Sequence, residues 1–163
     1  MFWMIILFTV FICFSLMIWR AAKGPVHSLA TLEVPIRDLL RRGYKEGFLV
    51  INIHYTKQFV QLKKYIHNKG NYGMEFCFPN TKWSDKLFVK LVEFCTETEI
   101  DFVIGEEHAK EPLEFLYIDF GKDVLLAHST IVDILLNVFG VDDDVKLFVR
   151  LENASVKDEL IEA

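Results

Sequence analysis

One short segment of this 163-residue chain combines side chains that can bind metal ions. Glu106, Glu107, His108 and Glu111 are close in sequence, and carboxylate and imidazole groups are common ligands of zinc and iron. No second histidine stands at ligand spacing, and the segment has the polarity of an exposed connection. A solvated charge cluster is therefore the favoured interpretation, and a metal-dependent enzyme using the 106–111 loop is the alternative.

The other reactive residues do not combine into a catalytic pattern. The Asp142-Asp143-Asp144 run lacks the glycine and the final ligand of a calcium-binding loop. Cys77 falls in an expected strand and Cys95 on the apolar face of an expected helix, where thiols are usually core residues. The chain contains no GxxxxGK, GxSxG or HExxH motif. We therefore expect a non-enzymatic protein with no cofactor and no catalytic or metal-binding residues.

Apolar periodicity indicates the elements that hold these residues in the first half of the chain. Residues 20–34 contain Gly24-Pro25 and little periodicity, which is typical of a linker. A helix is expected over residues 35–42, ending at Gly43. Strands are expected over residues 48–54 and 74–78, followed by a helix that begins at Ser84 and Asp85.

Residues 56–68 fit two different structures. As a helix, Phe59, Leu62 and Ile66 would line one face. As a strand, Val60, Leu62 and Ile66 would face one way, although Lys64 breaks the pattern. A hairpin with a loop at residues 55–57 is favoured, because aromatic and β-branched residues open the segment.

The second half predicts two strands, a long helix and a last strand. Strands over residues 100–104 and 113–120 are expected to pair antiparallel. The helix covers residues 124–139, with Asp123 as its N-cap and Gly140 beyond its end. The last strand covers residues 145–151, and residues 152–163 form a polar tail. Together these elements predict one α+β domain over residues 35–151, with a mostly antiparallel sheet packed by helices.

Residues 1–19 are apolar and uncharged, and Arg20 follows them directly. As a helix they would reach roughly 28 Å, which matches the hydrocarbon thickness of a bilayer. A cleaved signal peptide would need a basic start and small residues before the cut, and a lipidated Cys13 would need a smaller neighbour than Ile12. A retained transmembrane anchor is therefore favoured over both of these.

Charge predicts which side of the membrane the domain faces. Arg20 and Lys23 follow the anchor, which favours a single-pass protein with its domain in the cytoplasm. Residues 20–70 carry 10 Lys and Arg against 3 Asp and Glu, whereas residues 71–163 carry 8 against 20. The basic part either faces acidic lipid headgroups or consists of ordinary solvated positions, and both interpretations remain open. The absence of a nucleic-acid-binding motif argues against a nucleic-acid partner. The membrane-proximal basic residues are Arg20, Lys23, Arg37, Arg41, Arg42 and Lys45.

The long helix at residues 124–139 is apolar nearly all round. Such a helix is either deeply buried or covers a partner, and both interpretations remain open from the sequence. A partner groove or a homodimer face would use the apolar residues that lie outside the core stripe. The candidate partner-binding residues are Leu125, Val132, Leu136 and Phe139.

The order of helix, three strands, helix, two strands and helix resembles that of type III secretion chaperones and YbjN-like bacterial domains. The resemblance covers about residues 35–139. It implies a bacterial protein that binds other proteins through helix and sheet surfaces, often as a dimer, and that is not an enzyme.

These expectations converge on a membrane-anchored domain that binds another protein as an adaptor, a chaperone-like protein or an immunity-type protein. The metal-dependent enzyme described above is one alternative. A structural subunit of a membrane complex is the other, although residues 1–19 contain no small-xxx-small pair for close helix packing.

Overall fold

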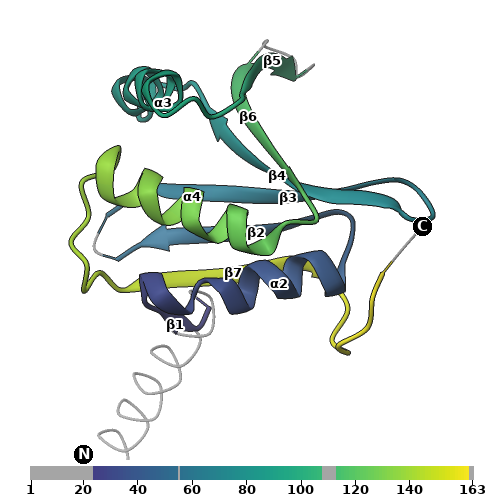
Figure 1. The fold of residues 1–163 in the computed structure, drawn as a ribbon. Helices are drawn as coiled ribbons and strands as arrows, with labels where there is room; N and C mark the ends of the chain where they lie inside the picture. The colour runs from purple at the N-terminus through teal and green to yellow at the C-terminus, as the bar shows by residue number, and fades with distance from the viewer. Residues whose placement is uncertain (1–23, 55, 108–112, 162–163) are drawn as a thin grey trace, which may run out of the picture.

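A computed structural model describes residues 24–54, 56–107 and 113–161 of the chain. These residues form an α+β domain with one seven-stranded sheet and three α-helices (Figure 1). The helices are α2 (Glu33–Arg42), α3 (Asp85–Glu97) and α4 (Val124–Asn137), and a 3-10 turn, η1 (Leu29–Thr31), precedes α2. The strands are β1 (Val26–His27), β2 (Gly43–Ile53), β3 (Phe59–Asn68), β4 (Asn71–Pro79), β5 (Val103–Glu107), β6 (Leu113–Gly121) and β7 (Leu147–Ala154).

The strands lie in the order β1-β7-β2-β3-β4-β6-β5, and every pairing between described strands is antiparallel. The predicted α+β class and antiparallel sheet are confirmed. The hairpin at residues 56–68 is also confirmed, because β3 pairs with β2 from Phe48↔Lys63 to Asn52↔Phe59. The pairing of β5 with β6 agrees with the prediction as well, although β5 begins later in the sequence than expected.

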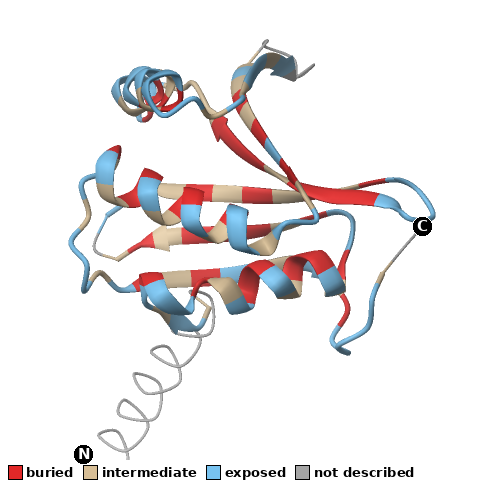
Figure 2. Cartoon of the chain, viewed as in Figure 1, coloured by how far each residue is buried: buried red, intermediate tan, exposed pale blue. Residues whose placement is uncertain are grey.

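The helices cover one face of the sheet, and the core lies between them and that face. In Figure 1, α2 and α4 run side by side over the strands, and the two helices contact each other. Burial alternates along β3, where Val60, Leu62, Lys64 and Ile66 are the buried residues. Figure 2 shows buried and less buried segments alternating along the strands. The Asp123 carboxylate accepts a hydrogen bond from the Leu126 N–H at 2.9 Å, which confirms the predicted N-cap of α4.

Two segments expected to be irregular take part in the fold. Residues 24–34, assigned to a linker, form β1, η1 and the first residues of α2, and they bury Leu29 and Leu32. Periodicity did not reveal this segment because it is too short to contain a repeating pattern. In the expected polar tail, β7 extends to Ala154 and the Ile161 N–H donates to the Arg41 carbonyl at 2.8 Å.

Within the described ranges, no helix combines the length and apolar character needed to cross a bilayer. The expected anchor, residues 1–19, lies outside those ranges.

Candidate functional site

The face of the sheet that points away from the helices carries a mixed aromatic and charged surface, which we call the open face. Its side chains alternate with those of the core along each strand. Three rows of neighbouring residues cross it, each with at most one residue from any strand. The central row contains Arg150, Val50, Gln61, Cys77, Tyr117 and Val103. A second row contains Glu152, Phe48, Lys63, Glu75 and Asp119. A third contains Phe148, Asn52 and Phe59 on one side and Pro79, Phe115 and Gly105 on the other.

A broad depression of about 820 Å³, here called the acidic cavity, lies on the open face near β5. Its walls come from four strands and from the segment that enters β5. The lining side chains are Lys63, Glu75, Tyr117 and Asp119, with Asp101, Phe102 and Val103 on the β5 side. The cavity therefore brings together three carboxylates, two aromatic rings and one lysine.

Tyr65 reaches across β4 to Asp119, one of the residues that line the cavity. Its hydroxyl donates to Asp119 Oδ1 at 2.9 Å, although β4 lies between their two strands. Tyr65 is opposite Gly73 on β4, and a Cβ at Gly73 would lie 2.4 Å from the Tyr65 hydroxyl oxygen. The glycine is therefore needed so that the phenol can cross the strand. Asp119 Oδ1 also accepts from the Gly121 N–H at 2.9 Å, which fixes the carboxylate.

The electrostatics of the cavity favour a cation. Burial raises the pKa of Tyr65 to about 12, helped by its hydrogen bond to Asp119 and by the charges of Asp119 and Glu75. Lys63, the cation of the lining, lies 2.7 Å from the Glu46 carboxylate. Lys63 is also directly opposite Glu75 on β4, and the three lining carboxylates outnumber this one lysine. Carboxylates around an aromatic ring can bind an ammonium or guanidinium group.

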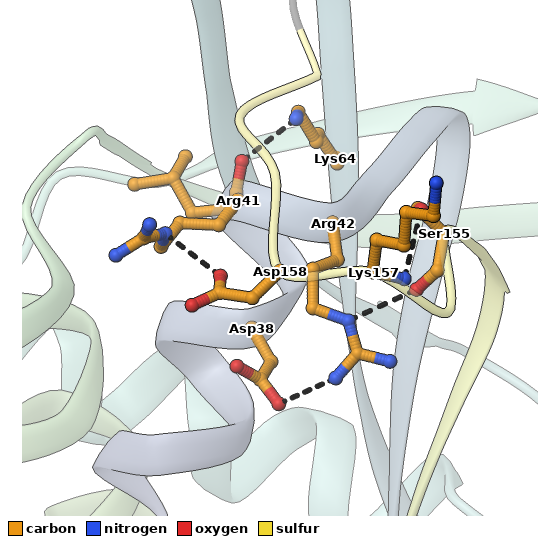
Figure 3. A network of polar contacts seen from close by, with 8 residues as sticks. Asp38, Arg41, Arg42, Lys64, Ser155, Lys157 and Asp158 are labelled. Atoms are coloured by element: carbon orange, nitrogen blue, oxygen red, sulfur yellow. Dashed lines mark hydrogen bonds and ion pairs between the residues drawn. The ribbon is translucent and has the colours of Figure 1, made fainter.

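The basic residues expected to face lipid lie elsewhere and are partly used within the domain. Figure 3 shows Arg41 and Arg42 beside the C-terminal segment. Arg41 Nε is 3.1 Å from Asp158 Oδ1, and Arg42 Nε donates to the Ser155 carbonyl at 2.9 Å. Arg42 also pairs with Asp38 at 2.9 Å. These two arginines therefore hold residues 155–161 against the end of α2.

The other basic candidates do not form one patch in the described structure. Arg37 pairs with Glu33 one turn earlier on α2. Lys45 is exposed on β2, and its carbonyl accepts from the Asn153 side chain at 3.0 Å. Arg20 and Lys23 lie outside the described residues.

The four partner-binding candidates on and after α4 are not equally accessible. Leu125 has 65% of its surface exposed. The other three candidates are half-buried and pack against the core: Val132, Leu136 and Phe139. The Phe139 ring packs edge-on against the Phe78 ring, with 5.6 Å between the ring centroids. Leu126, which is 50% exposed, joins Leu125 at the start of the helix. The exposed apolar part of α4 is thus confined to its first turn.

The predicted metal loop is only partly described. Glu106 is exposed on β5, whereas His108 and Glu111 lie outside the described residues. No group of three or more His, Cys, Asp or Glu side chains suited to a metal ion occurs in the described ranges. Cys77 and Cys95 are both buried free thiols.

The acidic cavity was missed from the sequence, although one signal pointed toward it. Along residues 113–120, Phe115, Tyr117 and Asp119 alternate with Leu116 and Ile118, which predicts a strand with a second, partly polar face. The strand order that brings Glu75 beside Asp119 could not be inferred, because β4 pairs with β6 and not with the next strand in the sequence.

Comparisons with protein-family models, curated proteins and solved structures gave no significant match to this chain.

Proposed function

We propose that this chain is a membrane-tethered, non-enzymatic domain that binds another protein through the open face of its sheet. The observation that carries the proposal is the acidic cavity, set among the aromatic side chains of that face. Protein interfaces are enriched in aromatic residues, and their binding energy is concentrated in a few side chains that enter pockets. The open face has both components, because Tyr117 and Phe102 line the cavity, Phe48 and Phe115 are neighbours of lining residues, and Phe148 lies farther across the same face on β7.

The open face is a better candidate than the long helix. Of the four α4 candidates, only Leu125 is mainly exposed, and the rest contribute to the core. On the open face, by contrast, no described helix covers the rows of side chains. The partner-binding surface is therefore proposed on the sheet, with the first turn of α4 as the secondary position.

The tether is proposed from the sequence of residues 1–19 and from the charges of Arg20 and Lys23. A tethered domain meets partners that are themselves at or near the membrane, at a local concentration set by the tether. An adaptor, a chaperone-like protein and an immunity-type protein all use a binding surface in this way.

Site-specific photo-crosslinking in the native membrane tests the proposal. A benzophenone side chain replaces Tyr117 on the open face in one variant and exposed Ser129 on α4 in the matched control. We expect partner adducts at position 117 and none at 129. Adducts at 129 alone would move the site to α4, and absence of adducts at both positions would contradict a protein-binding function.

Reporter fusions test the orientation of the tether. A reporter that is active only in the cytoplasm, fused after Ala163, is expected to be active in the full chain and to sediment with membranes. An inactive reporter, together with activity of one that works only outside the cytoplasm, would contradict the proposed orientation.

A further inference from the structure

The edge of the sheet beside the acidic cavity is open to another strand. β5 is the last strand in the sheet order and pairs only with β6, so its outer backbone groups have no strand partner in the described chain. Its five pairs, from Val103↔Tyr117 to Glu107↔Leu113, run without a register shift. Val103 and Ile104 are 66% and 43% exposed. A regular edge with exposed apolar residues is a template for strand addition.

The opposite edge of the sheet, formed by β1, offers a much shorter template for strand addition. β1 consists of two residues, Val26 and His27, so it could pair with only a very short segment. Strand addition is therefore favoured at β5.

The geometry of β5 places an added strand beside the acidic cavity. Val103 lines the cavity, and Gly105 lies two residues further along the same side of the strand. Because Gly105 has no side chain, a Cβ there would meet only the Tyr117 ring, at 3.5 Å. The ring is thus accessible from the edge, and a side chain from a neighbouring strand can reach it.

The charge of the acidic cavity indicates which side chain of an added strand would bind there. Asp101, Glu75 and Asp119 supply carboxylates, while Tyr117 supplies an aromatic face. An arginine side chain matches this set, because its planar guanidinium stacks on an aromatic ring and donates several hydrogen bonds to carboxylates. Lysine satisfies the charge but not the stacking.

A second copy of this chain fits the same edge poorly. β5 has the sequence Val-Ile-Gly-Glu-Glu and contains no Lys or Arg. A second copy that paired through its own β5 would therefore bring no cation to the acidic cavity. The occupant is therefore a basic segment of a different protein.

We propose that an extended segment of a partner protein adds to the outer edge of β5 and places an arginine side chain in the acidic cavity. This inference rests on the proposed function and specifies its partner. The main-chain hydrogen bonds of the added strand supply affinity, and the arginine supplies specificity.

Peptide binding to the full chain in detergent micelles tests the proposal. The probe is a fluorescein-labelled heptapeptide, Thr-Val-Thr-Arg-Thr-Val-Thr, with Gln, Glu or Lys at the central position for comparison. We expect the arginine peptide to bind about tenfold or more tightly than the glutamine peptide. We also expect its affinity to fall with added salt, and the glutamate peptide to bind worst. Equal affinity of the four peptides, or no binding of the arginine peptide, would overturn the proposal.

Variants of the chain locate the binding. Asp101→Asn and Asp119→Asn are each expected to lower the affinity for the arginine peptide and to leave the affinity for the glutamine peptide unchanged. Asp133→Asn, an exposed carboxylate on α4, is the matched control and is expected to change neither. Equal loss with Asp133→Asn would show a non-specific charge effect and overturn the assignment. Thermal melting of each variant confirms that it is folded.

Backbone chemistry distinguishes strand addition from side-chain capture alone. N-methylation of alternate peptide residues on one edge and then on the other blocks each set of main-chain hydrogen bonds in turn. We expect one of the two methylated peptides to lose binding, and retention by both would overturn the strand-addition model. Failure of all peptides together with adducts at position 117 would reject this inference and retain the proposed function.

Discussion

The Nζ atom of Lys64 lies 2.8 Å from the carbonyl oxygen of Ile161, 97 positions further along the chain. The same Nζ donates to the Leu40 carbonyl at 2.7 Å, in the last turn of α2. A cation at this position complements the negative end of the helix dipole. The side chain is fully buried, and its contacts join a helix end, a central strand and the C-terminal segment.

Replacement of Lys64 with methionine is expected to release the C-terminal segment. The change leaves two carbonyls without their buried donor, which should lower the free energy of unfolding by about 1–3 kcal/mol. The Ile161 N–H, bonded to the Arg41 carbonyl, should lose its protection against hydrogen exchange. Lys63→Met is the matched control. Lys63 directly precedes Lys64, lies on the open face of the sheet and pairs with Glu46 near the surface. It should cost less than about 1 kcal/mol and leave Ile161 protected. Unchanged exchange at Ile161 in Lys64→Met would contradict the assigned role.

The phenol of Tyr65 is expected to titrate later than an ordinary tyrosine. Its pKa is about 12 in the folded chain, against 10.0 for the unperturbed group. Since the folded state holds the proton more tightly, Tyr65 supports folding below pH 10 and loses this contribution as pH rises toward 12. Absorbance titration near 295 nm should show a transition near pH 12 that is missing in Tyr65→Phe. Asp119→Asn should lower the midpoint, because it removes both the charge and the carboxylate acceptor. A wild-type midpoint near 10 for Tyr65 would disprove this environment.

Gly73→Ala is expected to separate Tyr65 from Asp119. The new methyl group would lie 2.4 Å from the Tyr65 hydroxyl oxygen and 2.8 Å from the Gly121 carbonyl oxygen. Relief of this overlap should cost about 1–3 kcal/mol of stability and break the hydrogen bond. Denaturant unfolding measures the cost, and the tyrosine titration should move toward pH 10. Gly70→Ala offers a contrast, because a Cβ there meets nothing within 4 Å. Its positive φ of 82° gives it a strain cost, but the Tyr65 titration should not move.

The thiol of Cys95 is expected to be inert in the folded chain. Burial raises its pKa to about 11 from 9.0, so at pH 8 its thiolate fraction is about a hundredfold lower than that of a free thiol. With Cys13 and Cys77 replaced by serine, reaction with an aromatic disulfide reagent at pH 8 should be negligible in the native state and fast in denaturant. Rapid native-state reaction would show that α3 opens from the sheet.

Asp123→Ala tests the cap of α4. The change removes the acceptor of the Leu126 N–H and should cost about 1 kcal/mol, measured by denaturant unfolding. Asp133→Ala, at an exposed mid-helix position, is the control and should have a smaller effect. Equal effects of the two changes would indicate that charge, and not capping, stabilises the helix.

Local signals in the sequence were sufficient for most elements of the sheet. Strand alternation at Val60 and Leu62 and the cap at Asp123 depend on neighbours in the chain, and all three are as expected. Lys64 looked like an exception to the alternation because its partners, Leu40 and Ile161, are distant in sequence. The role of Leu29 was missed for a similar reason, since its burial depends on the packing of η1 against the rest of the core.

The candidate site was less accessible to prediction than the fold. Tyr117 and Asp119 can be placed on one side of a strand from their spacing. Their approach to Glu75 and Asp101 requires the strand order, which depends on long-range pairing. The apolar character of α4 reflects its burial against the core, so it does not mark a partner surface.

The position of β7 determines when the domain can be completed during synthesis. Of the strands in the described ranges, β7 is the last to leave the ribosome, yet it lies between β1 and β2, the first two of them to be made. Ile53 ends β2 and Leu147 begins β7, so at typical elongation rates the interval is on the order of ten seconds. Throughout that time one side of β2 and all of β1 lack a strand partner. If the N-terminus engages a membrane as proposed, the nascent chain would carry an unfinished sheet there, and chaperones that bind exposed strands are expected to act in this interval.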